Sequence, residues 1–312
     1  MTDDEFTAYQ ALADETDDHR WAFGTGFTDP LEGIDTSVPD GVNAAALSAY
    51  CLMLGDDALI YSHRLQQWMT RLPELEEETA VANIALDLLG QARMLLARAG
   101  RAEGAVLARS TGLTGSTGLT GSTGRDEDQL AFFRAEHEFR NVRLAEHLDA
   151  DFAELAGRLL IFSTWRLALL RRLQDSADPV LAAIAAKGAK ELAYHRDYAA
   201  QWVIRLGDGT ELSRGRMQAA LRAIWPLVDE LFRADAVTAD LPGVAPDPAG
   251  LRAEFDSVLG TVLATATLDL PDTAPMAQVA GKSGRDGVHT EALGYVLAEL
   301  QSVARADPDA TW

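Results

Sequence analysis

The chain has 312 residues, of which 47% are hydrophobic, and it is long enough to bury a sizeable core. Acidic residues outnumber basic ones by 48 to 27, and the resulting formal charge of −21 would repel nucleic acid and anionic membrane surfaces. We therefore exclude both as partners. The N-terminus MTDDEFTAYQ has neither the basic nor the apolar region of a signal peptide. A single cysteine, Cys51, excludes a disulfide framework, so we expect a cytoplasmic protein.

The basic residues are nearly all arginine, because only Lys187, Lys190 and Lys282 are lysines. A carboxylate-rich, lysine-poor surface suits a cytoplasm of high salt, where the excess charge is screened. A GC-rich genome, which favours arginine and alanine codons, would give the same composition. Both interpretations stay open, and neither affects the function.

The first segment, residues 1–42, combines many acids with few aliphatic residues, and we interpret it as a solvated tail. Residues 43–71 and 74–99 then carry apolar residues at alternating steps of four and three, which predicts two helices. Cys51 lies on the first apolar stripe, where we expect a small buried hydrophobe. The short connection makes the two helices antiparallel neighbours.

The later segments predict further helices. Residues 110–124 repeat the hexamer STGLTG, and we expect a flexible loop there. We expect one helix over residues 126–147, with Leu130, Phe133, His137 and Leu144 on one side. We expect two further long helices over residues 151–174 and 178–206, which match the first two predicted helices in length. Three shorter helical patterns follow at residues 214–232, 248–266 and 289–306. We expect Pro226 to break the first of these.

The fold class is therefore all-α. We predict a four-helix core of residues 43–71, 74–99, 151–174 and 178–206, decorated by the remaining helices, within one domain of residues 43–312.

A long-helix bundle raises the question of a di-iron centre, which needs about four carboxylates and two imidazoles converging on the core. We searched the four core helices for this set and found it broken at three or more points. The positions resembling ligands are Asp57, Asp87, Gly90, Ser163, Glu191, Tyr194 and His195. Gly90 stands where the second helix needs a histidine, and Ser163 stands where the third helix needs an acid.

Glu191 and His195 are spaced one helical turn apart beside an apolar face. They could act as metal ligands or as an acid and a base. We favour an internal hydrogen bond between them in a mostly apolar interior.

Several blocks, in this order, resemble a known family: LGDDALIYSHRLQQW, PELEEETAVANIALDLLGQAR, AFFRAEHEFRN, KELAYHRDYA and GVHTEALG. The chain resembles the structural (PaaC-type) subunit of ring-1,2-phenylacetyl-CoA epoxidase, from about residue 43 to Trp312. The resemblance implies a ferritin-like fold and a place in aerobic phenylacetate degradation. It also implies association with a homologous catalytic subunit that holds the di-iron centre, with a further small subunit and with a reductase. No cofactor is expected in this chain. The alternative is a ferritin-like di-iron oxygenase in its own right.

The segment 281–294 is our candidate for part of the partner contact. It joins a glycine-rich loop, which can follow a partner's surface closely, to a polar cluster at a helix start. The candidate contact residues are Lys282, Arg285, His289, Thr290 and Glu291. A capping role for Thr290 alone would explain some of this pattern.

Overall fold

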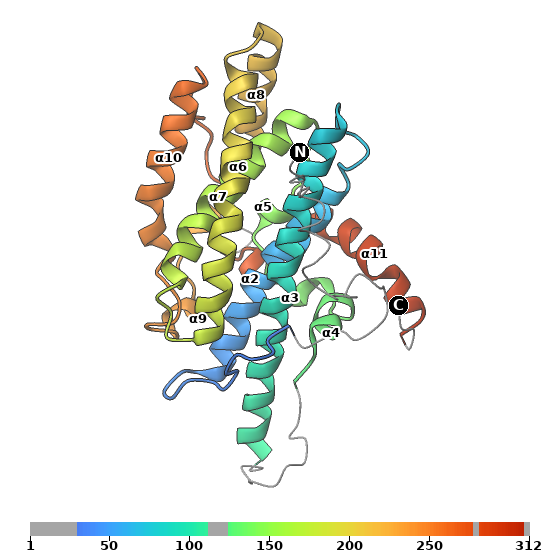
Figure 1. Ribbon diagram of the computed structural model, residues 1–312, viewed down its shortest axis with the longest axis vertical. Helices are drawn as coiled ribbons and strands as arrows, with labels where there is room; N and C mark the ends of the chain where they lie inside the picture. Colours follow the sequence, from blue (N-terminus) through green and yellow to red (C-terminus); the bar gives the residue numbers. More distant parts are fainter. Residues whose placement is uncertain (1–29, 112–123, 277–280, 309–312) are drawn as a thin grey trace, which may run out of the picture.

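The computed structural model describes residues 30–111, 124–276 and 281–308, and all regular elements in these ranges are helices. Four long helices form the core, as predicted: α2 (Ala44–Gln66), α3 (Leu75–Thr111), α6 (Phe152–Leu173) and α7 (Pro179–Gly207). The helix pairs α2/α3 and α6/α7 pack along their lengths, and α3 also packs against α7. Figure 1 shows α3 and α7 side by side with α2 and α6 behind them. The all-α, ferritin-like prediction is confirmed.

The core helices begin where the sequence provides caps. The side chains of Asn43, Asp151 and Asp178 accept hydrogen bonds from the first backbone N–H groups of α2, α6 and α7. Proline at the first position of α7 has no N–H to leave unpaired. Cys51 is fully buried on α2, as expected of a small hydrophobe.

Shorter helices surround the α2/α6 layer. They are α5 (Arg143–Glu146), α8 (Glu211–Ile224), α9 (Ala236–Ala239), α10 (Arg252–Thr265), α11 (Glu291–Ala306) and the 3₁₀ turn η4 (Pro248–Leu251). Two further 3₁₀ turns, η2 (Trp225–Leu227) and η3 (Asp229–Phe232), follow α8, because Pro226 ends that helix as predicted. Since α2 contacts α5, α9 and α11, and α6 contacts α8, η4 and α10, both helices are buried around nearly their whole circumference.

The single helix predicted over residues 126–147 is wrong. The structure has α4 (Glu127–Phe132), the 3₁₀ turn η1 (Glu136–Glu138) and α5 instead, and Phe133 and His137 are exposed. The reason lies on α2, where two adjacent buried carboxylates bind this segment. The Asp56 carboxylate accepts from the backbone N–H of Arg140 at 2.8 Å, and Asp57 accepts from that of Val142 at 2.8 Å. These carboxylates replace the helix carbonyls that would otherwise accept from the two N–H groups.

The expected tail is partly outside the described residues. Residues 1–29 lie outside the described residues, and so do residues 112–123 of the predicted loop. The first two residues of that loop, Ser110 and Thr111, belong to the end of α3. Residues 30–42 pack on the bundle, because Leu31 is buried and Arg98 donates to the carbonyl oxygens of Thr36 and Ser37. For residues 30–42 the structure therefore corrects the expected solvated tail, because this stretch contacts the bundle.

Two helices, α2 and residues 75–110 of α3, are long and apolar enough to cross a membrane by length and composition alone. The apolar window of α2 is 83% buried inside the protein, as in a core helix, whereas that of α3 is 50% buried. The exposed residues of α3 include Leu86 and Leu89, with the polar Asn83 one turn before Leu86.

Candidate functional site at the centre of the bundle

The expected ligand positions on α3 and α7 fall on two different sides of these helices. Gly90 and Tyr194 face outward, and the side chain of Tyr194 is 57% exposed. Their neighbours Gln91 and His195 are buried in the bundle. A search for a ligand three residues after Asp87 or Glu191 therefore tests residues that do not point into the core.

The predicted hydrogen bond between Glu191 and His195 is wrong. The Nε2 atom of His195 lies 2.9 Å from Oδ2 of Asp87, and Glu191 accepts from Nε2 of Gln91 at 2.9 Å. Asp87 and Gln91 are one turn apart on α3, as His195 and Glu191 are on the antiparallel α7. Asp87 therefore binds His195, and Gln91 binds Glu191, across the interface between the two helices. Glu191 and His195 each have a partner on α3 in place of the bond within α7.

An arginine that the sequence search overlooked occupies the centre of the bundle. Arg166 of α6 is fully buried, and its Nε donates to Oε1 of Gln91 at 3.0 Å while its NH2 donates to the carbonyl of Leu54 at 3.2 Å. Through Gln91 the guanidinium is linked to Glu191, so it joins residues of all four core helices. Burial lowers the pKa of Arg166 to about 10, against the opposing charge of Asp57, and the group remains a cation at neutral pH. An arginine in the middle of the apolar run FSTWRLALL was the available signal.

The remaining expected positions also have partners within the chain. Asp57 is fully buried and binds Arg285, at 2.8 Å from its NH2 and 3.0 Å from its NH1. The hydroxyl of Ser163 donates to the carbonyl of Leu159 at 2.6 Å, one turn back in the same helix.

These residues do not fit a di-iron centre. Two iron ions need about four carboxylates and two imidazoles around one space. Here Asp57, Asp87 and Glu191 are bound to an arginine, a histidine and a glutamine, and the guanidinium of Arg166 lies among them. A fixed cation at this place would repel a metal ion.

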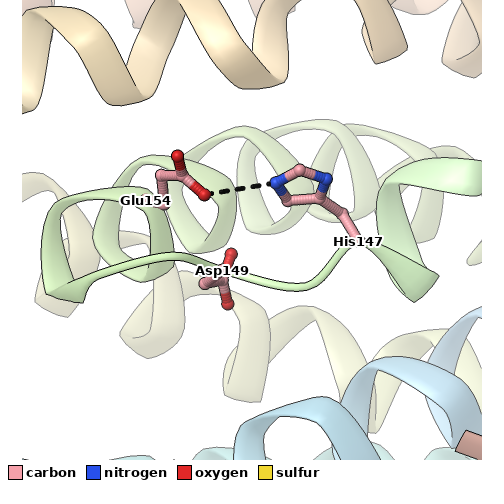
Figure 2. A group of neighbouring side chains, drawn as sticks. All are labelled: His147, Asp149 and Glu154. Atoms are coloured by element: carbon pink, nitrogen blue, oxygen red, sulfur yellow. Dashed lines mark hydrogen bonds and ion pairs between the residues drawn. The ribbon is translucent and has the colours of Figure 1, made fainter. Parts of the chain in front are cut away.

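A second cluster, His147, Asp149 and Glu154, brings three potential ligand atoms within 4.8 Å of one another. Figure 2 shows the His147 ring directed at Glu154, with Nε2 and Oε2 separated by 3.3 Å. Asp149 uses both carboxylate oxygens on the buried guanidinium of Arg158, and Glu154 also accepts from the backbone N–H of Ala150. The cluster is therefore a set of internal hydrogen bonds beside a buried arginine, which disfavours a cation.

The residues predicted to contact a partner divide into two groups. Lys282 and Glu291 are exposed. In contrast, Arg285 makes internal bonds to Asp57, and the side chain of His289 is 0% exposed. The expectation that Arg285 and His289 contact a partner is thus corrected, because their side chains fasten the segment onto its own bundle.

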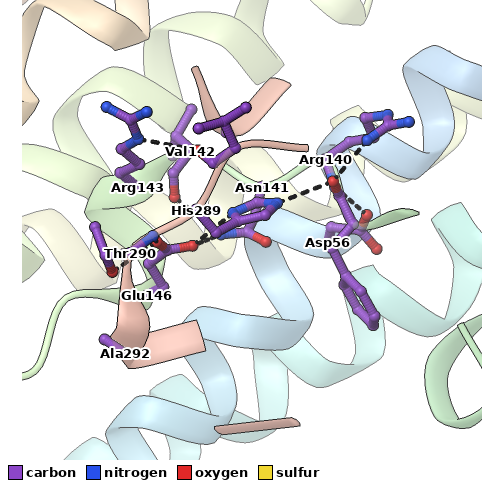
Figure 3. Close-up of polar contacts among 12 residues, drawn as sticks. Asp56, Arg140, Asn141, Val142, Arg143, Glu146, His289, Thr290 and Ala292 are labelled. Atoms are coloured by element: carbon purple, nitrogen blue, oxygen red, sulfur yellow. Dashed lines mark hydrogen bonds and ion pairs between the residues drawn. The ribbon is translucent and has the colours of Figure 1, made fainter. Parts of the chain in front are cut away.

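Glu146 is the centre of this fastening (Figure 3). Its carboxylate accepts from Asn141 Nδ2 at 2.8 Å, from the Thr290 N–H at 2.6 Å and from the Thr290 hydroxyl at 2.8 Å. Thr290 therefore does not cap its own helix, α11, with its side chain.

His289 completes this network with both ring nitrogens. Nδ1 lies 2.8 Å from Glu146, and Nε2 lies 3.0 Å from the carbonyl oxygen of Phe139. Burial alone lowers the pKa of His289, but the hydrogen bond and charge of Glu146 outweigh burial, so the net shift is upward. Both nitrogens face acceptors, as the imidazolium form requires.

Comparison with known proteins agrees with the resemblance seen in the sequence. The profile of the family described as "Phenylacetic acid catabolic protein" matches residues 35–312. The chain is 40% identical over 268 residues to a protein of Escherichia coli (strain K12) that is named as a component of 1,2-phenylacetyl-CoA epoxidase. That alignment covers 85% of this chain and 99% of its relative. The chain therefore belongs to the phenylacetic acid catabolic protein family.

Proposed function

We propose that this chain is the non-catalytic structural subunit of a multicomponent phenylacetyl-CoA epoxidase in aerobic phenylacetate degradation. Its role is to support a homologous catalytic subunit that carries the di-iron centre, together with a further small subunit and a reductase. The similarity over nearly the whole length of the Escherichia coli epoxidase component supports the place in the complex.

One observation supports the absence of catalysis in this chain. The guanidinium of Arg166 lies at the centre of the bundle, hydrogen bonded to Gln91 and to the Leu54 carbonyl, where the fold would hold its metal ions. The cation links the core helices without supplying a group that could activate oxygen. The alternative, a di-iron oxygenase in its own right, would need Asp87 and Glu191 to give up His195 and Gln91.

Reconstitution from separately purified components tests the proposal. We expect phenylacetyl-CoA-dependent oxygen consumption only when the catalytic subunit and this chain are both present, and none from this chain with the reductase alone. The variant Glu191→Gln of this chain should keep the turnover per intact complex. Turnover by this chain with the reductase alone would contradict the proposal, as would full turnover by the catalytic subunit without this chain.

A further inference from the structure

Residues 283–290, which we call the strap, lie directly on the segment that precedes α5. A Cβ atom built on Gly284 would lie 2.1 Å from the carbonyl oxygen of Asn141, and one built on Gly287 would lie 2.2 Å from that of His137. Glycine permits this close approach of two backbones, and Gly287 also has a positive φ of 75°. Backbone N–H groups of the underlying segment are in turn bound to carboxylates of α2. The strap therefore packs on a segment that α2 holds in place.

The two ends of the strap are bound to the bundle by different chemistry. At the first end the guanidinium of Arg285 binds both carboxylate oxygens of Asp57. Arginine is not deprotonated in proteins, so this end does not titrate. At the other end His289 and Thr290 bind the carboxylate of Glu146 (Figure 3). Histidine changes its charge between about pH 5 and pH 8, so this end can respond to pH.

Glu146 is surrounded by hydrogen-bond donors. Its oxygens accept from the side-chain amide of Asn141 and from the N–H and hydroxyl of Thr290, and they also face Nδ1 of His289. An ionised carboxylate, which only accepts, fits this arrangement, so Nδ1 carries a proton. Nε2 faces the carbonyl oxygen of Phe139 at 3.0 Å and needs a proton as well. The hydrogen bonds at this end are therefore complete only while the imidazole is protonated.

The charges around His289 link its proton to the attachment of the strap. Glu146 of α5 and Asp56 of α2 supply the negative charges that act on the ring. The charged groups packed nearby have partners of their own: the ion pairs Asp56–Arg134 and Asp57–Arg285, the arginines Arg64, Arg140 and Arg143, which donate to backbone carbonyls, and Glu230 and Asp286, which accept from backbone N–H groups. Loss of the His289 proton therefore leaves the buried carboxylate of Glu146 without its cation.

The helix that follows the strap has a small buried side. Four of the 16 residues of α11 are buried, namely Leu293, Val296, Leu297 and Gln301. Segments with few buried apolar contacts open locally at a lower free energy than the core of a protein. The hydrogen bonds of the strap therefore contribute strongly to holding this part of the chain on the bundle.

We propose that the strap is a pH-sensitive conformational switch, which is closed while His289 is protonated and opens locally, together with the start of α11, when that proton is lost. The bond between Arg285 and Asp57 keeps the first end attached. The raised pKa of His289 agrees with a closed state that holds the proton more tightly than the open state. Stabilisation of the closed state is complete below about pH 6.5 and is lost as pH rises through the closed-state pKa.

Hydrogen exchange of the isolated full chain, measured by mass spectrometry between about pH 5.5 and pH 9, tests this switch. Dividing each exchange rate by the intrinsic rate at the same pH gives an opening constant for peptides of the strap and of α2. We expect the opening constant of the strap to be flat below about pH 6.5 and to rise above it, by at most about tenfold per pH unit, because one proton is lost. The opening constant of α2 should be at least about tenfold lower at every pH.

Three variants assign the pH dependence to His289. His289→Gln should make the opening constant of the strap independent of pH. Thr290→Val removes one donor to Glu146 and keeps the histidine, so it should raise the opening constant at every pH and keep the rise above about pH 6.5. His137→Gln, at an exposed histidine beside the strap, is the matched control and should behave as the wild type.

A wild-type opening constant that does not change with pH would overturn the switch. Equal opening constants for the strap and α2 would also overturn it, because the strap would then open only when the whole chain unfolds. A rise with pH that persists in His289→Gln would assign the titration to another group and contradict the proposal. The wild-type profile decides the question even where a variant does not fold. The measurement needs no partner, so its outcome is independent of the proposed function.

Discussion

Buried arginines bound to carboxylates are the main polar feature at the scale of single residues. Arg98, Arg134 and Arg158 are almost completely buried and bind Asp178, Asp56 and Asp149 respectively. A buried ion pair adds little net stability compared with apolar residues, but breaking it leaves a charge without its partner. These pairs therefore fix which segments meet rather than supplying most of the folding free energy.

Asp149→Asn should lower the free energy of unfolding by about 3–5 kcal/mol, because it leaves the guanidinium of Arg158 buried and uncompensated. Urea denaturation measures the change. The control is Asp256→Asn, which removes an exposed ion pair with Arg252 and should cost at most about 1 kcal/mol. Equal effects of both substitutions would show that burial does not control the cost.

The imidazolium of His289 should make stability depend on pH. The folded-state pKa is raised above the ordinary value of about 6.5, so the folded protein holds its proton more tightly than the unfolded chain. The stabilisation is fully present below about pH 6.5 and is lost as pH rises through the folded-state pKa.

We expect the difference in unfolding free energy between the wild type and His289→Gln to shrink steadily from pH 6 to pH 9. Chemical denaturation at half-unit steps checks this trend. A difference that grows with pH would mean that His289 is neutral in the folded protein.

At the scale of elements, the sequence predicts the helices whose stability comes from their own apolar stripe. The four core helices, the break at Pro226 and the aspartate caps of α6 and α7 follow local patterns. Residues 126–147 could not be predicted, because their backbone N–H groups bind carboxylates some 85 residues away on α2. No residue pattern within 126–147 indicates that these N–H groups bind carboxylates of α2.

The same limit applies to the candidate site. The sequence shows that the di-iron ligand set is incomplete, but it does not show which neighbour points inward. Gly90 and Gln91 differ by one position, and only packing against α7 turns Gln91 toward Glu191. Arg285 and His289 look like surface residues in the sequence, because their partners Asp57 and Glu146 are far away along the chain.

Two glycines on facing helices should respond oppositely to alanine. Gly90→Ala should raise the free energy of unfolding of the isolated chain by up to about 1 kcal/mol, because a Cβ there meets nothing within 4 Å. At Gly188 a Cβ would lie 2.7 Å from Leu170 Cδ1 and 3.2 Å from Gln91 Cδ, so alanine should be destabilising. Thermal unfolding of both variants checks the signs. A lower melting temperature for Gly90→Ala would show that the α3 face is already packed in the isolated chain.

At the scale of the whole molecule, the bundle keeps the helix arrangement of a ferritin-like protein while its centre holds an arginine. The shorter helices enclose α2 and α6, and some of them also contact the other two core helices: α8 and α10 contact α7, and α4 contacts α3. An arginine at the centre suits the structural subunit that we propose.

Metal analysis of the isolated chain shows whether the bundle binds iron. The chain is expressed alone in iron-supplemented medium, purified without chelators, and its iron is measured by inductively coupled plasma mass spectrometry; the catalytic subunit, prepared identically, is the positive control. With Arg166 at the centre of the bundle, bonded to Gln91 and the Leu54 carbonyl, we predict far less than one iron per chain. An iron content close to two per wild-type chain would contradict the proposal that this chain is a structural subunit without a metal centre.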